Sequence, residues 1–505
     1  MNIITRCADY IYRSRLNTIE SYGRKADHIQ YAQLDLLLKY AKRTVWGQQH
    51  DFTGIHHYTD FVRHIPLQTY DTLKPYIKRM MNGEENILWP SKARWYAKSS
   101  GTTNDKSKFI PVTPEILKYC HYRGGYDTIG LYLRNNPKSS FFSRKGLILG
   151  GSLSPSPLNQ KVHCGDLSAV LIQNIPTWVN LVRIPGKKIM LMNEWEAKIE
   201  AVITQTLKKD VGSISGVPSW ILVLIKALLK RAGKETLTEV WPNLEVFFHG
   251  GISFDPYKSQ YKSLIPSEKM HYMETYNASE GFFAIQDDPN DSSLLLMLDY
   301  GIFYEFIPVN ELDRSDDPKA IPFEEVKVGE IYAMVISTVG GLWRYQIGDT
   351  VRFTSLHPPK IEILGRTHHY INAFGEELMV DNAEKSIQIA CQQTGAMVHA
   401  YTAAPLFMLD KAKGRHQWLI EFEKAPASVE TFAKILDSSL QSLNSDYEAK
   451  RYKDFTLLLP EIHLAKERLF LDWLKMKGKL GGQHKVPRLS NDREMIEELL
   501  RLNKF

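Results

Sequence analysis

The sequence predicts an α/β protein with a large N-terminal domain of mixed β-sheets and packed helices and a smaller, mobile C-terminal α+β domain. The chain has 505 residues, more than one hydrophobic core usually accommodates. Short apolar runs alternate with helical segments through its first part. After Gly365 the pattern becomes that of a compact unit of a size that folds alone. We therefore predict domains over residues 1–364 and 365–505.

The N-terminal domain is predicted to begin with helices and to continue with strands. From Tyr31 to Val45 apolar residues recur in a mostly helical pattern. Pro218 begins a second apolar helix that ends in Lys230-Arg231, so we expect a buried helix there. The predicted strands are short runs of β-branched or aromatic residues, several bounded by Gly or Pro. They are Gly146–Leu149, Glu245–Phe248, His271–Thr275, Leu294–Leu298, Tyr304–Ile307, Ile331–Ser337 and Lys360–Leu364.

The C-terminal domain is predicted to combine helices with a few strands. A helix around Asn382–Thr394 precedes strands near Val398–Thr402 and His416–Phe422. A long helix follows over about Val429–Asn444.

The composition excludes several classes of function. The net charge of +6, from 63 basic and 57 acidic residues, is too small over this length to indicate binding to nucleic acid or to a membrane surface. The N-terminus lacks the apolar region of a signal peptide, and the most apolar helical run, Trp220–Ile225, is far shorter than the ~20 residues of a bilayer span. The four cysteines form no C-x-x-C pair, so we expect reduced thiols. We expect a cytoplasmic monomer or weak homodimer.

The segment most informative about function runs from Lys98 to Lys108 and reads Lys-Ser-Ser-Gly-Thr-Thr-Asn-Asp-Lys-Ser-Lys. Its glycine lets the backbone approach an anion closely. Backbone N–H groups and hydroxyls can donate to phosphate oxygens, and the lysines supply positive charge. The spacing of a Walker A motif is absent. Composition alone would favour a surface loop, but the ordered Ser-Ser-Gly-Thr-Thr string followed by lysines favours a phosphate-binding loop.

This loop resembles the phosphate loop of the adenylate-forming superfamily, which includes acyl-CoA synthetases and firefly luciferase. The extra residue before Lys-Ser-Lys is similar to the Gretchen Hagen (auxin-responsive promoter) acyl-acid amido synthetases, which join an acyl acid to an amino acid through an acyl-adenylate. Asp105 departs from the superfamily, which commonly has glycine there. The resemblance implies a luciferase-like fold, ATP and Mg²⁺ as cofactors, and a carboxylic acid and an amino acid as substrates. The implied nucleotide contacts are Ser99, Ser100, Gly101, Thr102, Thr103 and Lys108.

The strand end at Phe248–Ser253 resembles the turn that lies against the adenine in this superfamily. The residues concerned here are Gly250, Gly251 and Ile252. Read alone, the segment is equally typical of a tight turn after a strand.

The string Tyr276-Asn277-Ala278-Ser279-Glu280-Gly281 resembles the family's Tyr-x-x-Ser-Glu element. The resemblance implies that Tyr276 stacks on the adenine and that Ser279 belongs to the nucleotide site. It also implies that Glu280 binds the Mg²⁺ that bridges the ATP phosphates, since Mg²⁺ needs few carboxylates. Alone, Glu280 would be read as a surface residue.

Two further motifs concern the ribose and the hinge. Residues 343–349, Trp-Arg-Tyr-Gln-Ile-Gly-Asp, resemble the Tyr-Arg-x-Gly-Asp element, which implies that Asp349 accepts hydrogen bonds from both ribose hydroxyls. Residues 360–367 resemble the hinge motif, with His368 in place of its usual aspartate. We expect the C-terminal domain to rotate about residues 365–368 and Arg366 to meet phosphate. The following string contains Phe374, a candidate substrate contact.

Near the C-terminus, Gly-Gly-Gln-His-Lys-Val-Pro-Arg at residues 481–488 resembles the loop that carries the catalytic lysine, here Lys485. A lysine delivered by domain rotation would neutralise the charge that develops as a carboxylate attacks the α-phosphate. In isolation the loop would be read as a basic solvent loop, but the Gln-x-Lys-Val-Pro-Arg string favours the catalytic interpretation.

The substrate sites are less defined by the sequence. Arg123 and Tyr126, on a predicted helix after the phosphate loop, are candidates to contact the acyl acid, with a core or surface role as the alternative. A second group shares one helix face by its spacing and either recruits the amine or forms a structural hydrogen-bond network, which we favour. It consists of Asn444, Tyr447, Glu448 and Arg451.

Together the motifs predict an ATP-dependent acyl-acid amido synthetase with Lys485, Glu280 and Arg366 as catalytic residues. Two alternatives stay open from the sequence. One is an acyl-CoA ligase that forms a thioester through the same acyl-adenylate. The other is a nucleotide-binding protein without catalysis, which the presence of Glu280, Asp349 and Lys485 disfavours.

Overall fold

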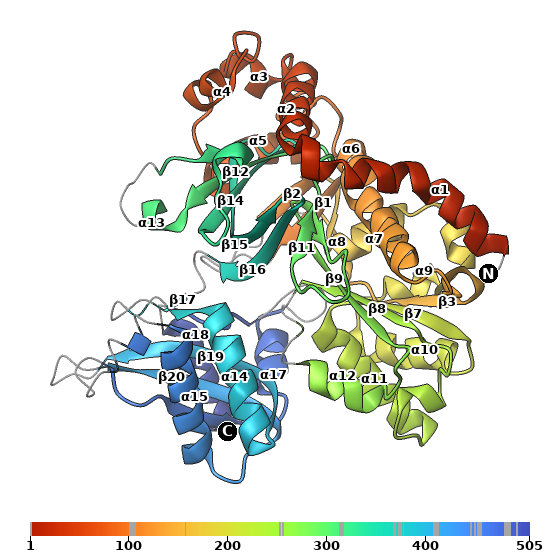
Figure 1. Ribbon diagram of the computed structural model, residues 1–505, viewed down its shortest axis with the longest axis vertical. Helices are drawn as coiled ribbons and strands as arrows, with labels where there is room; N and C mark the ends of the chain where they lie inside the picture. Colours follow the sequence, from red (N-terminus) through yellow and green to blue (C-terminus); the bar gives the residue numbers. More distant parts are fainter. Residues whose placement is uncertain are drawn as a thin grey trace.

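The computed structural model describes residues 3–99, 108–156, 158–251, 254, 257–312, 318–366, 370–371, 376, 378–407, 414–444, 447–448, 451, 457–478, 486–490 and 493–504. Mixed β-sheets with packed helices make up the chain through residue 366. A separate group of elements follows, coloured cyan to blue in Figure 1. The α/β class predicted from the sequence is thereby confirmed.

The chain begins with a series of helices. The predicted helix over Tyr31–Val45 is confirmed in its first part and buries Leu34, Leu37 and Leu38. It ends earlier than predicted, because Thr44 caps a new helix by accepting a 2.9 Å hydrogen bond from the backbone N–H of Gly47. The helices are α1 (Ile3–Glu20), α2 (Tyr22–Ala41), α3 (Val45–Gln49), α4 (Tyr58–His64) and α5 (Tyr70–Met81).

A twelve-stranded sheet forms the centre of the N-terminal part. Its five strands at one end, β9-β8-β7-β3-β6, run parallel, and the others pair antiparallel. Every strand predicted before residue 365 lies in this sheet. In spatial order it contains β13 (Ile321–Pro322), β12 (Ile302–Pro308), β14 (Ile331–Thr338), β15 (Tyr345–Leu356), β16 (Pro359–Arg366), β11 (Leu294–Leu296), β10 (Gly281–Ile285), β9 (His271–Ala278), β8 (Val246–Gly250), β7 (Val211–Gly216), β3 (Lys145–Ile148) and β6 (Arg183–Ile184).

A smaller sheet carries the predicted phosphate loop. Its order is β2 (Lys108–Val112), β1 (Trp95–Ser99), β5 (His163–Gly165) and β4 (Leu153–Pro155). Strands β1 and β2 are antiparallel, with Ser99 opposite Lys108. The two ends of the predicted loop are therefore held side by side.

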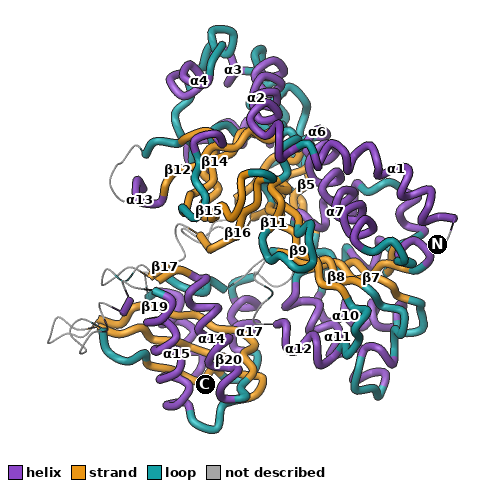
Figure 2. Tube along the Cα trace, viewed as in Figure 1, coloured by secondary structure: helices purple, strands orange, loops and turns teal. Residues whose placement is uncertain are grey.

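Helices cover both faces of the parallel strands. Figure 2 shows α1 and α7 on one side of β7 and β8, and α10, α11 and α12 on the other. The predicted buried helix at Pro218 is confirmed as α11. The helices are α6 (Pro114–Ile116), a π-helical turn (Leu117–His121), α7 (Tyr122–Asn135), α8 (Leu167–Asn174), α9 (Lys187–Met190), α10 (Trp195–Thr206), α11 (Pro218–Ala232), α12 (Lys258–Leu264) and α13 (Val309–Leu312).

The C-terminal elements form a small α+β unit. Strand β20 lies between β19, its antiparallel partner, and β21, its parallel partner. The predicted helices and strands of this part are confirmed within a few residues, apart from β19, which extends to Phe407. The elements are β17 (Tyr370–Ile371), β18 (Leu378–Met379), α14 (Val380–Thr394), β19 (Met397–Phe407), β20 (Gly414–Lys424), α15 (Val429–Leu443), β21 (Glu461–Ala465), α17 (Leu469–Met476) and α18 (Glu494–Asn503).

The buried apolar side chains form separate clusters in the N-terminal and C-terminal parts of the chain. The clusters of the N-terminal part end at Ile361, and those of the C-terminal part begin at Ile371 and centre on residues such as Trp418 and Leu469. The boundary after residue 364 and the rotation about residues 365–368 stay predictions. None of the helices in the described ranges is long and apolar enough to cross a bilayer. Cys120, Cys164 and Cys391 are free thiols.

Candidate active site

The β9–β10 hairpin carries the predicted adenine and metal residues. Tyr276 lies in β9, Gly281 begins β10, and Ser279 and Glu280 form the turn between the strands. The exposed fractions of Tyr276, Ser279 and Glu280 are 5%, 4% and 6%. Glu280 is therefore not the exposed surface carboxylate that the sequence alone would suggest.

Tyr276 and Asp349 are in direct contact, although 73 residues separate them in the chain. The phenol of Tyr276 donates a 2.6 Å hydrogen bond to Oδ2 of Asp349, and both residues are buried. Asp349 lies in β15, directly opposite the backbone of Arg366 in β16. The residues predicted to contact the adenine and the ribose thus lie together.

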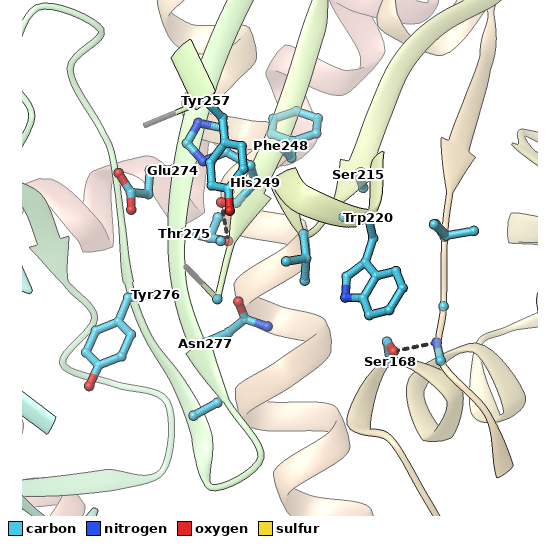
Figure 3. Close-up of a pocket in the computed structure, with 18 of the residues that line it drawn as sticks. Ser168, Ser215, Trp220, Phe248, His249, Tyr257, Glu274, Thr275, Tyr276 and Asn277 are labelled. Carbon is cyan, nitrogen blue, oxygen red and sulfur yellow. Dashed lines mark hydrogen bonds between the residues drawn. The ribbon is translucent and has the colours of Figure 1, made fainter. Parts of the chain in front are cut away.

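The turn after β8 approaches the neighbouring strand closely. A Cβ atom on Gly250 would lie 2.2 Å from the carbonyl oxygen of Thr275, and Gly251 has a φ of 82°, which favours glycine. The hydroxyl of Thr275 donates a 3.2 Å hydrogen bond to the carbonyl oxygen of His249, drawn as a dashed line in Figure 3. The paired glycines therefore leave the backbone of this turn open where it meets the cavity.

A cavity of about 2630 Å³ runs along this turn and the hairpin, and both the N-terminal and the C-terminal parts of the chain line it. Figure 3 shows part of its wall, where Glu274 and Tyr276 project from one side of β9 and Thr275 and Asn277 from the other. This volume exceeds that of an ordinary small-molecule pocket and suits two substrates together. The predicted site residues that line it are Tyr126, Gly250, Gly251, Tyr276, Ser279, Glu280 and Asp349.

Other predicted residues are placed only in part. Ser99 ends β1 and Arg366 ends β16, and only their backbones are described. Lys108 begins β2 and is not among the described residues that line the cavity; its Nζ lies 5.9 Å from the centre of the Tyr70 ring. The remaining predicted site and hinge residues lie outside the described residues. They are Ser100, Gly101, Thr102, Thr103, Ile252, Thr367, His368, Phe374 and Lys485.

The structure separates the two candidate acyl-acid contacts. Tyr126 lies at the cavity, with its ring centre 4.2 Å from that of Tyr12. Arg123 is not among the described lining residues; its guanidinium forms an ion pair of 3.1 Å with Asp299 and lies over the ring of Tyr300. The described contacts of Arg123 therefore fit the core or surface alternative better than binding of the acid.

A second pair of glycines at the cavity was not singled out from the sequence. Lys198, buried in α10, donates hydrogen bonds of 3.0 and 2.9 Å to the carbonyl oxygens of Gly150 and Gly151. Burial lowers the pKa of Lys198 to about 8, against the opposing effect of Asp166. The hydroxyl of Ser168 accepts a 2.9 Å bond from the N–H of Gly151. The signal in the sequence was a Gly-Gly pair directly after the predicted strand Gly146–Leu149, and a similar pair occurs at residues 250–251.

His249 lies at the cavity as a neutral ring. It stacks on Phe254 with ring centres 4.1 Å apart. Burial, together with the nearby charge of Lys258, lowers its pKa to about 3. It therefore adds no positive charge beside the glycine turn.

The C-terminal part contacts the N-terminal part through Arg488, the last residue of the predicted catalytic loop. Its guanidinium donates a 3.0 Å hydrogen bond to the hydroxyl of Tyr257, the residue before α12. It also pairs with Glu384 at 3.4 Å and lies 4.7 Å from the centre of the Tyr401 ring. Lys226 forms an ion pair across the same junction with Glu423.

Three of the four residues grouped near the end of α15 form a structural hydrogen-bond network, the alternative favoured from the sequence. Arg451 donates to both carboxylate oxygens of Asp437, at 2.6 and 2.9 Å, and Tyr447 donates to the same carboxylate at 2.8 Å. The side chain of Asn444 accepts a 2.8 Å bond from the N–H of Tyr447. These contacts fix the end of α15.

The two carboxylates at the cavity, Glu280 and Asp349, fit a nucleotide with a magnesium ion. Mg²⁺ takes one or two carboxylates and fills its other positions with phosphate oxygens and water, so a single buried Glu280 meets its needs. Within the described residues, no group of three or more His, Cys, Asp or Glu side chains is placed to hold a metal ion. The carboxylate of Asp349 has the acceptor chemistry that ribose hydroxyls require.

Solved structures define the class of this fold. It is similar to a GH3.15 acyl acid amido synthetase, with a TM-score of 0.77 at 18% identity over 97% of this chain and 95% of that one. It is also similar to a 2-hydroxyisobutyryl-CoA ligase solved with an adenylate, with a TM-score of 0.58 at 11% identity over 95% and 92% of the two chains. The fold is that of the adenylate-forming enzymes, as predicted.

Family models then give the family. The model of the GH3 family N-terminal domain matches residues 15–270, that of the central domain residues 295–366, and that of the C-terminal domain residues 381–494. The chain belongs to the GH3 family, which confirms the family predicted from the motifs. One relative is the indole-3-acetic acid-amido synthetase GH3.4 of Arabidopsis thaliana, 23% identical over 94% of this chain and 91% of that protein.

Proposed function

We propose that this protein is an ATP-dependent acyl-acid amido synthetase. It adenylates a carboxylic acid with release of pyrophosphate and then transfers the acyl group to the amino group of an amino acid. The observation that carries the proposal is the meeting of Tyr276, Glu280 and Asp349 with the Gly250–Gly251 turn at one large cavity. The names of GH3 relatives as amido synthetases favour an amide over a thioester product.

In the first half-reaction, Tyr276 and the Gly250–Gly251 turn hold the adenine, and Asp349 accepts hydrogen bonds from the ribose hydroxyls. Glu280 would hold Mg²⁺, which would offset the negative charge of the phosphates. A carboxylate oxygen of the acid attacks the α-phosphorus, and the bond to the pyrophosphate oxygen breaks.

The charged residues of the loops complete the first step. Lys485 and Arg366 neutralise the charge that develops on the α-phosphate, and Lys108 together with residues 99–103 contacts the phosphates. In the second half-reaction an uncharged amine attacks the acyl carbonyl, AMP leaves, and the amine nitrogen loses a proton. The C-terminal domain, residues 365–505, rotates about residues 365–368 between the two steps. The separate apolar clusters of the two parts support independent movement.

We also propose that the protein is a cytoplasmic monomer or weak homodimer and that neither nucleic acid nor a membrane is its partner. The weak net charge of the sequence supports the part of this proposal that concerns nucleic acid and membranes.

Acid-dependent ATP–pyrophosphate exchange tests the proposed function. Purified protein with Mg²⁺, ATP and labelled pyrophosphate is expected to exchange label only when a carboxylic acid is present, because the acid must accept the adenylyl group. A panel of acids, followed by amino acids or coenzyme A in separate reactions, identifies the product. If none of the acids in the panel supports exchange, adenylation is contradicted. If a thioester forms and no amide forms, the protein is a coenzyme A ligase instead.

Tyr257→Phe is expected to slow the first half-reaction about three- to tenfold, since it removes one charge-assisted hydrogen bond between the two parts of the chain. Val486 and Pro487 line the same cavity as Tyr276. We therefore assign the observed arrangement of the two parts of the chain to the adenylation step. Pyrophosphate exchange measures this step, and amide formation from preformed acyl-adenylate measures the second. Tyr40→Phe, at a 60% exposed position, is the matched control. If both steps slow equally, the Arg488–Tyr257 bond does not act in the domain arrangement of the first step alone.

A further inference from the structure

A short connection joins the two sheets of the N-terminal part. Residues 149–152 run from the end of β3 in the large sheet to the start of β4 in the small sheet. Gly150 and Gly151, in the middle of this connection, line the cavity. The small sheet also contains β1 and β2, whose ends hold the proposed phosphate loop. The conformation of this connection therefore affects how the small sheet lies against the large one.

Both carbonyl oxygens of this glycine pair accept hydrogen bonds from one ammonium group. Nζ of Lys198, in α10, lies 3.0 Å from the oxygen of Gly150 and 2.9 Å from that of Gly151. Lys198 is 2% exposed and both of its described bonds go to uncharged oxygens, although a buried charge is costly without an ion pair. A methionine would fill the same space without that cost. We therefore assign to the lysine the task of holding the two carbonyl groups.

The start of α8 holds the same turn from its other side. The hydroxyl of Ser168 accepts the N–H of Gly151 at 2.9 Å, a bond that Figure 3 draws as a dashed line. Asp166 accepts a 2.7 Å bond from the N–H of Ser152 and donates its own N–H to the carbonyl oxygen of Ser152 at 3.0 Å. A Cβ atom on Gly151 would lie 2.1 Å from Oδ2 of Asp166, so the packing is close. Lys198 and α8 together fix the conformation of the turn.

Asp166 connects this turn to the strand that precedes the phosphate loop. It follows β5 directly, and β5 pairs in parallel with β1, so that Gly165 lies opposite Ala97. Strand β1 ends two residues later at Ser99, the first of the proposed phosphate contacts. A Cβ atom on Gly165 would lie 2.6 Å from the carbonyl oxygen of Ser152, so the turn and β5 are in close contact. We therefore expect a shift of the turn to move β5, β1 and Ser99 together.

We infer that Lys198 is a positioning residue for ATP: by holding the Gly150–Gly151 turn, it sets where the end of β1 meets the phosphates. The inference rests on the proposed adenylation and deepens it. Lys198 is not among the described residues that line the cavity, so it acts through the turn. Apolar side chains of the small sheet, such as Tyr96 and Ile110, belong to the main hydrophobic cluster. The sheet therefore stays folded without Lys198, and only its position changes.

The test compares the binding of ATP with Mg²⁺ and of AMP to the wild type and to Lys198→Met by isothermal titration calorimetry. Because AMP lacks the β- and γ-phosphates, the ratio of the affinity for ATP to that for AMP reports the contacts to these phosphates. This ratio is expected to fall at least about tenfold in Lys198→Met, the usual effect of losing one hydrogen bond to a charged group. A merely structural role would lower the fraction of protein that binds and leave the ratio unchanged. An unchanged ratio in folded Lys198→Met overturns the inference.

Lys187→Met is the matched control, because Lys187 of α9 also donates to a backbone carbonyl oxygen, that of Gln173 at 2.7 Å, and not to the turn. Its ratio is expected to match the wild type, and an equal fall there overturns the inference. If Lys198→Met does not fold, Ser168→Ala decides, since it removes the acceptor of the Gly151 N–H: a lower ratio supports the inference, and an unchanged ratio overturns it.

The wild type separates this inference from the proposed function. A wild type that binds ATP but shows no acid-dependent exchange contradicts the proposed function alone, and the affinity ratios still decide the role of Lys198. A wild type that binds no ATP contradicts both.

Discussion

Replacing Asp349 with alanine is expected to lower kcat/KM for ATP in acid-dependent pyrophosphate exchange by about a hundredfold or more. The proposed role of the carboxylate is to accept hydrogen bonds from both ribose hydroxyls, and a hydrogen bond to a charged group contributes about 1.5–3 kcal/mol. Two such bonds correspond to at least about two orders of magnitude in rate. The substitution also removes the acceptor of the 2.6 Å bond from Tyr276.

Tyr276→Phe separates the two consequences of that substitution. It keeps the ring that is proposed to stack on the adenine and the carboxylate that is proposed to bind the ribose, and it removes only the phenol donor. We expect a smaller loss than in Asp349→Ala, because one hydrogen bond to the carboxylate is lost while the two proposed bonds to the ribose remain. Similar losses in Tyr276→Phe and Asp349→Ala would mean that Asp349 acts by holding Tyr276 and not by binding ribose. Matching chemical unfolding curves would exclude a loss of folded protein.

The strands that the sequence predicts share a local signal. Runs such as Ile331–Ser337 are short, β-branched or aromatic, and bounded by turn residues, and each became a strand of the large sheet. Strand β10, Gly281–Ile285, was not predicted, because it begins at the last glycine of the Tyr276–Gly281 motif and its five buried residues show no alternation of buried and exposed positions. Their burial depends on β9 and β11, which only the tertiary fold brings alongside.

The candidate site also has features that the sequence predicts and contacts that only the tertiary fold creates. The motifs at residues 276–280 and 349 were visible because the chemistry requires particular residue types in a fixed order. The bond between Tyr276 and Asp349 was not predicted, since it depends on how β9 and β15 are placed in the sheet. Lys198 carries no local signal either, because its partners are backbone carbonyls at residues 150 and 151. The partner of Arg123, Asp299, is 176 residues away.

Arg344→Met is expected to lower the free energy of unfolding by about 3–5 kcal/mol, the usual effect of breaking a buried ion pair from one side. The side chains of Arg344 and Glu305 are 4% and 0% exposed. Nε of Arg344 donates to both oxygens of Glu305, at 3.1 and 3.0 Å. Methionine would leave the carboxylate buried without its counter-charge, although Tyr58 still donates a 2.8 Å bond to it.

The same guanidinium joins the N-terminal helices to the sheet. It donates a 2.7 Å bond to the carbonyl oxygen of Ile65, which follows α4, while Glu305 belongs to β12. Urea unfolding measures the loss. Lys434→Met, in a pair with Glu430 whose side chains are 63% and 73% exposed, is the control and should cost at most about 0.5 kcal/mol. A loss of that size in Arg344→Met would contradict burial of the pair.

The double variant Arg344→Met/Glu305→Leu distinguishes charge burial from lost packing. Because leucine removes the unpaired carboxylate, we expect it to recover a large part of the stability that Arg344→Met alone loses. Arg344 stands five residues before Asp349 in the motif that also carries the proposed ribose contact. If Arg344 acts only through this pair, kcat/KM per folded molecule should be nearly normal in the double variant. A hundredfold loss there would instead place Arg344 with the residues that orient Asp349.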